Sequence, residues 1–177
     1  LGAGKTTFVR YLAEAAGVDV MLLGSGSVRS TRLGPIVTLS DFVACFPYAD
    51  SLTRYTVNGA TLRRMFERWM RAENRTGEGE CYQVNSAVKV TYSEGQRRVT
   101  WLGVRGEPVQ DERPYTVALQ GYHSSNSKTY LDVTAEELAS LARPRLVTKD
   151  VQTLLLDAMR ENQNQRRTVE GRIVYQP

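Results

Sequence analysis

Residues 22–30 read LLGSGSVRS, and this stretch is the most informative part of the chain. Apolar residues precede it and predict a buried strand, which ends in four small residues: Gly24, Ser25, Gly26 and Ser27. Small residues let backbone N–H groups come close to a ligand. Arg29 follows, and a guanidinium can hold a phosphate or carboxylate with paired hydrogen bonds. The stretch therefore predicts an anion site at the carboxyl end of a strand, where open α/β sheets usually bind ligands. A purely structural Gly/Ser turn is the alternative, and local chemistry alone favours it.

The pattern around this stretch mixes helices and strands without a regular βαβ alternation. Helical periods and capping signals predict helices over residues 7–16, 38–46, 60–72, 134–141 and 149–161. Period-two alternation predicts strands over residues 18–23, 51–57, 81–92, 97–104, 115–119 and 171–175, with 81–92 and 97–104 joined as a hairpin. We therefore predict a single α+β domain, a mixed sheet with flanking helices, rather than a doubly wound fold.

The charge of the chain does not indicate a nucleic-acid partner. The formal net charge is +4 and the sequence pI about 9.2, but the basic residues are spread along the sequence. The densest run, around Arg64 and Arg68, has the spacing of the solvated face of a helix. No apolar run approaches the length of a membrane span. Of the two cysteines, neither has metal-ligand spacing, and Cys45 has the surroundings of a small core residue.

Residues 2–7, GAGKTT, end like a phosphate-binding loop. The full motif requires a glycine five residues before Gly4 and a strand leading into the loop, and the sequence provides neither. No apolar strand ends in an aspartate suited to Mg²⁺. The stretch is better explained as the beginning of a helix, and a P-loop NTPase fragment is kept as a weak alternative.

The sequence does not predict an independent catalytic centre. His123 is the only histidine, and no cluster of Asp, His and Asn could supply ligands for two metals. With no Cys–His pair and no activated serine, we assign no catalytic and no metal-binding residue to this chain.

Two tyrosines occupy positions from which a ring can project into a cleft. Tyr48 follows a predicted helix end, and Tyr122 follows a predicted strand end. Two such rings can sandwich a planar base, and each stack contributes about 1–3 kcal/mol. From spacing alone, however, a place at the rim of the core explains both rings more simply.

Taken in order, these segments resemble the C-terminal domain of the 5′-nucleotidase family, whose members are two-domain metallophosphoesterases. GSGSVR at residues 24–29 is similar to the family loop NGGGIR, and residues 34–41 resemble the Gly-x-Ile-Thr-x-x-Asp start of its short helix. Further similarities lie at residues 47–48, 59–62, 82–84, 105–109, 114–118 and 169–173. The departures are Gly24 for the asparagine that opens the loop, and Lys128 for an aspartate that binds ribose hydroxyls in many members. These departures put ribose recognition of that kind in doubt and indicate a divergent member.

The resemblance implies that residues 1–177 form the substrate-binding domain. Tyr48 and Tyr122 would clamp the base, Arg29 would hold the phosphate, and the backbone of Gly24, Ser25, Gly26 and Ser27 would let the ligand approach. The implied reaction is hydrolysis of a nucleotide or related phosphate ester, in nucleotide catabolism. A covalently linked N-terminal metallophosphatase domain would hold two divalent metal ions, so the chain alone is expected to be inactive.

A non-catalytic ligand-binding or interaction module that kept the fold is the alternative to this interpretation. Family members occur both outside the cell and without export signals, so the resemblance does not fix a location. We expect no nucleic-acid partner and no membrane span.

Overall fold

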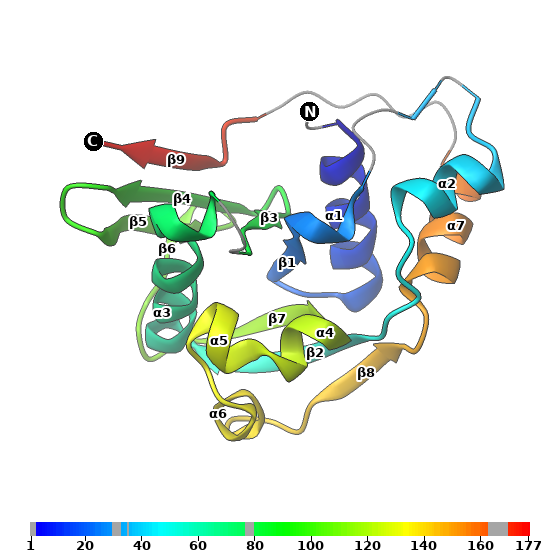
Figure 1. Cartoon of the computed structure of the whole chain (residues 1–177). Helices are drawn as coiled ribbons and strands as arrows, with labels where there is room; N and C mark the ends of the chain where they lie inside the picture. Colours follow the sequence, from blue (N-terminus) through cyan, green and yellow to red (C-terminus); the bar gives the residue numbers. More distant parts are fainter. Residues whose placement is uncertain (1–2, 30–32, 35, 77–79, 163–169) are drawn as a thin grey trace.

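The computed structural model of the chain describes residues 3–29, 33–34, 36–76, 80–162 and 170–177, with side chains from residue 6 onward. Its helices are α1 (Ala3–Ala16), α2 (Leu39–Cys45), α3 (Gly59–Trp69), α4 (Gly121–Ser125), α5 (Ser127–Leu131), α6 (Ala135–Ala139) and α7 (Val151–Glu161), with 3₁₀ turns η1 (Ser25–Ser27) and η2 (Ala72–Asn74) (Figure 1). Its strands are β1 (Val20–Gly24), β2 (Leu52–Asn58), β3 (Tyr82–Val84), β4 (Val88–Ser93), β5 (Arg98–Val104), β6 (Glu107–Pro108), β7 (Pro114–Gln120), β8 (Arg145–Thr148) and β9 (Ile173–Gln176).

The described strands form two mixed sheets. The first has the order β3-β1-β7-β2-β8, in which β1 and β7 are parallel and β3, β2 and β8 run antiparallel to their neighbours. The second has the order β6-β5-β4-β9, in which only β4 and β9 are parallel among the described pairs. Helices flank the sheets (Figure 1), so the predicted α+β fold with a mixed sheet is confirmed.

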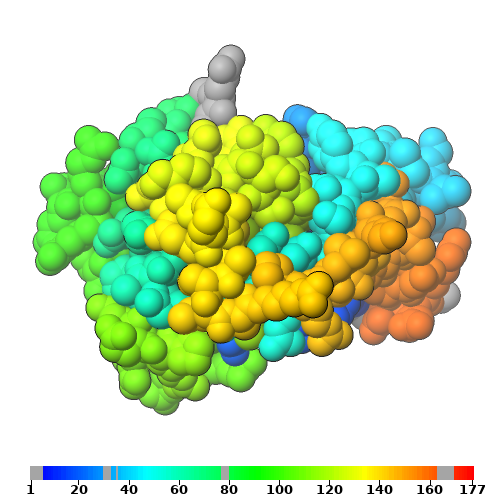
Figure 2. Space-filling view, turned by 90° about the horizontal axis from the view of Figure 1, so that it is seen from below, coloured from blue at the N-terminus to red at the C-terminus, as the bar shows by residue number. Residues whose placement is uncertain are grey.

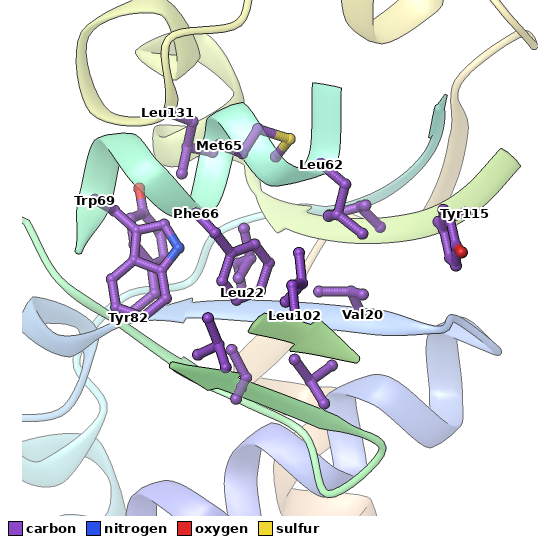
Figure 3. Packing of buried hydrophobic residues seen from close by; sticks show 14 of the residues in the cluster. Val20, Leu22, Leu62, Met65, Phe66, Trp69, Tyr82, Leu102, Tyr115 and Leu131 are labelled. Carbon is purple, nitrogen blue, oxygen red and sulfur yellow. The ribbon is translucent and has the colours of Figure 1, made fainter. Parts of the chain in front are cut away.

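Strand β1 is buried on both faces and separates two core clusters. Val20 and Leu22 pack into a cluster with α3 and the second sheet, and Figure 3 shows Phe66 and Trp69 of α3 in this cluster. Met21 and its neighbours on the other face belong to a second cluster with α1, α2 and α7. Two-sided burial explains why this strand is a continuous apolar run in the sequence rather than an alternating one.

Side-chain caps explain where several helices begin. Thr38 and Thr134 each accept a hydrogen bond from the third residue of their helix, and the acidic side chains of Asp41 and Glu137 accept one from the backbone N–H of the capping threonine, which completes two capping boxes. Asn58 caps α3 by accepting from the Thr61 N–H. The predicted starts of α2 and α6 are therefore confirmed.

The predicted strand over residues 81–92 is wrong as a single element. It is two strands in different sheets, β3 and β4, and only β4 forms the predicted hairpin with β5. Asn85 lies between them, and its amide accepts from the Met21 N–H at 2.9 Å and donates to the Asp19 carbonyl at 3.1 Å. These two bonds fix the crossing of the chain from one sheet to the other.

Other predictions differ in extent. The predicted helices over 60–72 and 134–141 end earlier, at Trp69 and Ala139, and α4, α5 and β8 were not predicted. Figure 2 shows residues 127–148 running across the middle of the lower face, from yellow to light orange. Helix α1 begins within the GAGKTT stretch, as expected for a helix start, while Gly2 and the Lys5 side chain lie outside the described residues.

The cysteines and the acidic residues of the described chain form no metal site. Cys45 is buried in the cluster of α1 and α2, as predicted. The described part of the chain holds no group of three or more His, Cys, Asp or Glu side chains suited to a metal ion. Among the described residues, none of the helices combines the length and apolar character that crossing a bilayer requires.

Candidate functional site

The sheet topology brings the ends of three strands to one edge of the first sheet. Because β1 and β7 are parallel, both end there, while β2 runs antiparallel and begins there, with Leu52 paired to Gln120. The segments that adjoin these ends carry all the residues predicted to bind a ligand. We call Arg29, Tyr48, Tyr122 and residues 24–27 the strand-end site.

The small residues at the end of β1 lead into a turn, and several of its donors have partners within the chain. The Gly26 N–H donates to Glu80 Oε1 at 3.1 Å, and Ser25 Oγ lies 3.4 Å from the same oxygen. Ser27 is buried, and its hydroxyl donates to Gln120 Oε1 at 2.7 Å. Glu80 thus occupies donors that were predicted to face an anionic ligand, and ligand contact by this turn stays a prediction.

The structure brings Arg29 and Tyr48 together. Arg29 Nε donates to the Tyr48 hydroxyl oxygen at 3.0 Å, and Nη2 donates to the same oxygen. The guanidinium carbon lies 5.4 Å from the ring centroid. The Arg29 N–H donates to the Cys45 carbonyl at 2.7 Å, which ties this segment to the end of α2. Both side chains stay accessible, and Tyr48 is 42% exposed.

Tyr122 lies in the first turn of α4 and is 54% exposed. Its N–H donates to Asp50 Oδ2 at 2.8 Å, and its hydroxyl oxygen lies 3.0 Å from that of Tyr130. Gly121 allows this approach, since a Cβ there would lie 2.4 Å from Asp50 Oδ1. Asp50 is two residues beyond Tyr48, a span of about 7 Å at most, so the two ring-bearing segments meet at Asp50.

The two predicted clamp rings do not touch each other. Tyr122 packs against His123 and Tyr130, and Tyr48 pairs with Arg29, with no ring contact between Tyr48 and Tyr122 in the described chain. Separated rings are what a sandwiched base would require. The role of these two rings as a clamp stays a prediction.

Next to Tyr122 the structure buries His123, a residue to which the sequence assigns no role. His123 is only 3% exposed, and its ring packs edge-on against Tyr82 at 5.1 Å and Tyr122 at 5.4 Å. Its Nε2 lies 3.8 Å from Glu80 Oε2, while its buried Nδ1 has no hydrogen-bond partner among the described residues. The sequence gives only a weak signal for the contacts of His123, namely that this histidine follows Tyr122, a residue predicted to bind the ligand.

The environment of Glu80 favours its charged form. Burial acts to raise the pKa of this carboxyl, but the polar contact with His123 and the hydrogen bonds from Gly26 and Ser25 outweigh burial and hold the pKa below its ordinary value. Burial raises the pKa of the neighbouring Tyr82 hydroxyl, which therefore stays neutral. The interior side of the site thus holds a charged carboxylate close to the neutral hydroxyl of Tyr82.

Lys128, the second departure from the family pattern, is paired within its own helix turn. Its Nζ donates to Asp132 Oδ1 at 2.6 Å, and its side chain is 67% exposed. The positive charge at this position is therefore balanced by a neighbouring carboxylate.

A separate cavity of about 320 Å³ lies between β3 and β9, lined by residues that include Trp69, Arg75 and Tyr175. It includes none of the residues of the strand-end site.

Comparison with known proteins identifies the family to which this fold belongs. The family profile described as 5′-nucleotidase, C-terminal domain, matches residues 6–136. The chain belongs to this family. The 5′-nucleotidase C-terminal domain accounts for the order of the motifs and for the mixed sheets described above. No curated relative was found by sequence comparison.

Solved structures show the same fold. A 5′-nucleotidase precursor from Thermus thermophilus is 19% identical with a TM-score of 0.74, and the match covers 97% of this chain and 34% of that chain. The NAD nucleotidase of Haemophilus influenzae is 16% identical with a TM-score of 0.72, covering 96% and 33%. The sulfate thiohydrolase SoxB from Thermus thermophilus, in complex with glycerol, is 17% identical with a TM-score of 0.66, covering 96% and 32%. The chain spans about a third of the length of these structures.

Proposed function

We propose that this 5′-nucleotidase C-terminal domain binds the substrate of a metal-dependent phosphoesterase that hydrolyses nucleotides or related phosphate esters. The observation that carries the proposal is the convergence at one sheet edge of an exposed cation, Arg29, and two exposed rings, Tyr48 and Tyr122. A nucleotide presents a planar base and an anionic group, which these side chains complement in kind.

Each residue has a definite role in this proposal. Tyr48 and Tyr122 stack on the two faces of the base, since tyrosine offers the same π-face as phenylalanine. Arg29 donates to the phosphate oxygens. Its present acceptor, the Tyr48 hydroxyl, takes hydrogen bonds from two of its nitrogens, so a phosphate must share or displace that contact.

The reaction itself is assigned to a linked N-terminal domain holding two divalent metal ions, by analogy with the family. Such ions supply a metal-activated water as the nucleophile. The residues of this chain bind and orient the substrate and carry no step of the chemistry. Purified chain supplied with Mn²⁺, Zn²⁺ or Co²⁺ is therefore expected to release no phosphate from AMP.

Calorimetry with AMP, adenosine and a nucleotide sugar tests the binding role. Tyr122→Ala should weaken all three, because stacking contributes about 1–3 kcal/mol per base. Arg29→Ala should weaken AMP binding and leave adenosine binding unchanged. Trp101→Ala is the matched control, since Trp101 is also a partly exposed aromatic residue but lies in β5 of the second sheet.

A non-catalytic interaction module is the second candidate. One observation favours it: Glu80 already occupies the Gly26 N–H and the Ser25 hydroxyl, which would otherwise be free for a ligand. If the folded wild-type chain binds none of AMP, adenosine and the nucleotide sugar, that result would favour the interaction module over the substrate-binding domain.

A further inference from the structure

A buried contact connects the two parts of the strand-end site. Glu80 accepts from the Gly26 N–H through Oε1, and its other oxygen lies 3.8 Å from His123 Nε2. The Glu80 side chain is 16% exposed and that of His123 is 4% exposed. The chain of contacts therefore runs inside the molecule, from the turn after β1 to the base of α4.

His123 in turn supports the exposed ring of Tyr122. The two ring centroids are 5.4 Å apart with an interplanar angle of 82°, an edge-to-face arrangement. Tyr130 contacts both, with its ring 6.4 Å from that of His123 and its hydroxyl 3.0 Å from that of Tyr122. The Tyr122 ring is thus held on its buried side by His123 and at its hydroxyl by Tyr130.

The imidazole occupies space that depends on the absence of a side chain at position 24. A Cβ on Gly24 would lie 2.2 Å from His123 Cε1 and 2.3 Å from its Nε2, closer than any tolerated contact. Glycine at the end of β1 and histidine at the start of α4 therefore form a matched pair. Gly24 is also where the sequence departs from the asparagine of the family loop.

We infer that His123 is a positioning residue of the strand-end site, which sets the Tyr122 ring and ties it through Glu80 to the turn of Ser25 and Gly26. The inference rests on the proposed function. It also accounts for a polar ring in a buried position: the buried Nδ1 has no partner among the described residues, a cost that leucine would avoid. The lowered pKa of Glu80 agrees with a carboxylate that stays charged beside the imidazole.

The test is a double-mutant cycle between His123→Leu and Tyr122→Ala, with AMP and adenosine as probes. Leucine fills most of the imidazole volume but cannot make a polar contact with Glu80. His123→Leu is expected to weaken the binding of both ligands about two- to tenfold, the loss that corresponds to one edge-to-face ring contact. In that background Tyr122→Ala should cost much less than in the wild type, because the ring has already lost its support. Glu80→Gln should reproduce the loss in smaller measure.

If His123 only stabilises the fold, His123→Leu should change the stability of the chain and not its affinity for either ligand. Val99→Ala, a buried change in the second sheet, controls for general destabilisation and should lower the melting temperature without changing either affinity. The inference is overturned if His123→Leu binds both ligands like the wild type, or if its effect and that of Tyr122→Ala simply add. If the wild-type chain binds neither ligand, the proposed function fails and the inference fails with it. If the wild-type chain binds the ligands but the effects of His123→Leu and Tyr122→Ala simply add, the inference about His123 is wrong and the proposed function stands.

Discussion

Removal of the Tyr48 hydroxyl is expected to change the binding of AMP and to leave the binding of adenosine unchanged. Tyr48→Phe removes one oxygen atom and keeps the ring that is proposed to stack on the base. That oxygen accepts from Arg29 Nε at 3.0 Å and from Nη2. The substitution therefore releases the guanidinium without changing its charge or its place in the chain.

The size of the effect follows from the exposure of the pair. A hydrogen bond to a charged group contributes about 1.5–3 kcal/mol in favourable settings. Tyr48 is 42% exposed and Arg29 is also exposed, so the contact is expected to lie nearer the range of surface charge interactions, about 0.5–1 kcal/mol. A phosphate that displaces this contact loses that amount of binding free energy, so Tyr48→Phe should tighten AMP binding about two- to fivefold. Adenosine has no phosphate, and its affinity should not change.

Calorimetric titration of both ligands at one fixed salt concentration measures the two affinities. Tyr122→Phe is the matched control, because it removes a hydroxyl that contacts Tyr130 and not an arginine. Equal changes for AMP and adenosine in Tyr48→Phe, or weaker AMP binding, would show that Arg29 does not exchange its hydroxyl partner for a phosphate.

Three further outcomes are expected from contacts in the fold. Gly121→Ala should destabilise the chain by about 1–3 kcal/mol in urea unfolding, since its Cβ would lie 2.4 Å from Asp50 Oδ1, whereas Gly95→Ala, whose nearest neighbour is 3.8 Å away, should not. Trp69→Ala should cost about 3–5 kcal/mol in the same assay, because Trp69 is fully buried; a loss below about 1 kcal/mol would contradict the described core. Glu80→Gln should lower the free energy of unfolding, and the difference from the wild type should reach its full size above about pH 4.3, the pKa of a free glutamate. The difference should disappear as the pH falls through the lowered pKa of folded Glu80. A pH-independent difference in unfolding free energy would contradict that assignment.

Local chemistry was enough to predict elements whose stabilising contacts are close in sequence. Thr38 and Thr134 reach only three residues along the chain to complete their capping boxes, so their helices were predicted at the correct start. The helix α3 could likewise be predicted from the sequence, because its buried side chains recur at helical spacing. The helices α4 and α5 are as short as α6 but have no side-chain cap hydrogen bond, so no local signal predicts them and tertiary contacts maintain them.

Remote contacts explain the remaining errors. The alternation from Cys81 to Tyr92 suits a single strand, and only the bonds from Asn85 to Met21 and Asp19 divide it between two sheets. The sequence assigns no catalytic or metal-binding role to His123, because it is the only histidine and no cluster of Asp, His and Asn accompanies it. Its contacts with Glu80 and Tyr82 come from a distant segment, and only the fold brings them together.

The core cluster that the two sheets share has a consequence for how the molecule opens. Val20 of β1 and Val90 of β4 belong to different sheets but to the same cluster. Neither sheet can lose its packing without exposing apolar surface of the other, so deep amides of both should exchange with solvent through one common opening. A ligand held at the edge of the first sheet would then slow hydrogen exchange in β4 and β5, where none of the strand-end residues lies. Hydrogen exchange in the second sheet would then show whether a ligand is bound at the strand-end site of the first sheet.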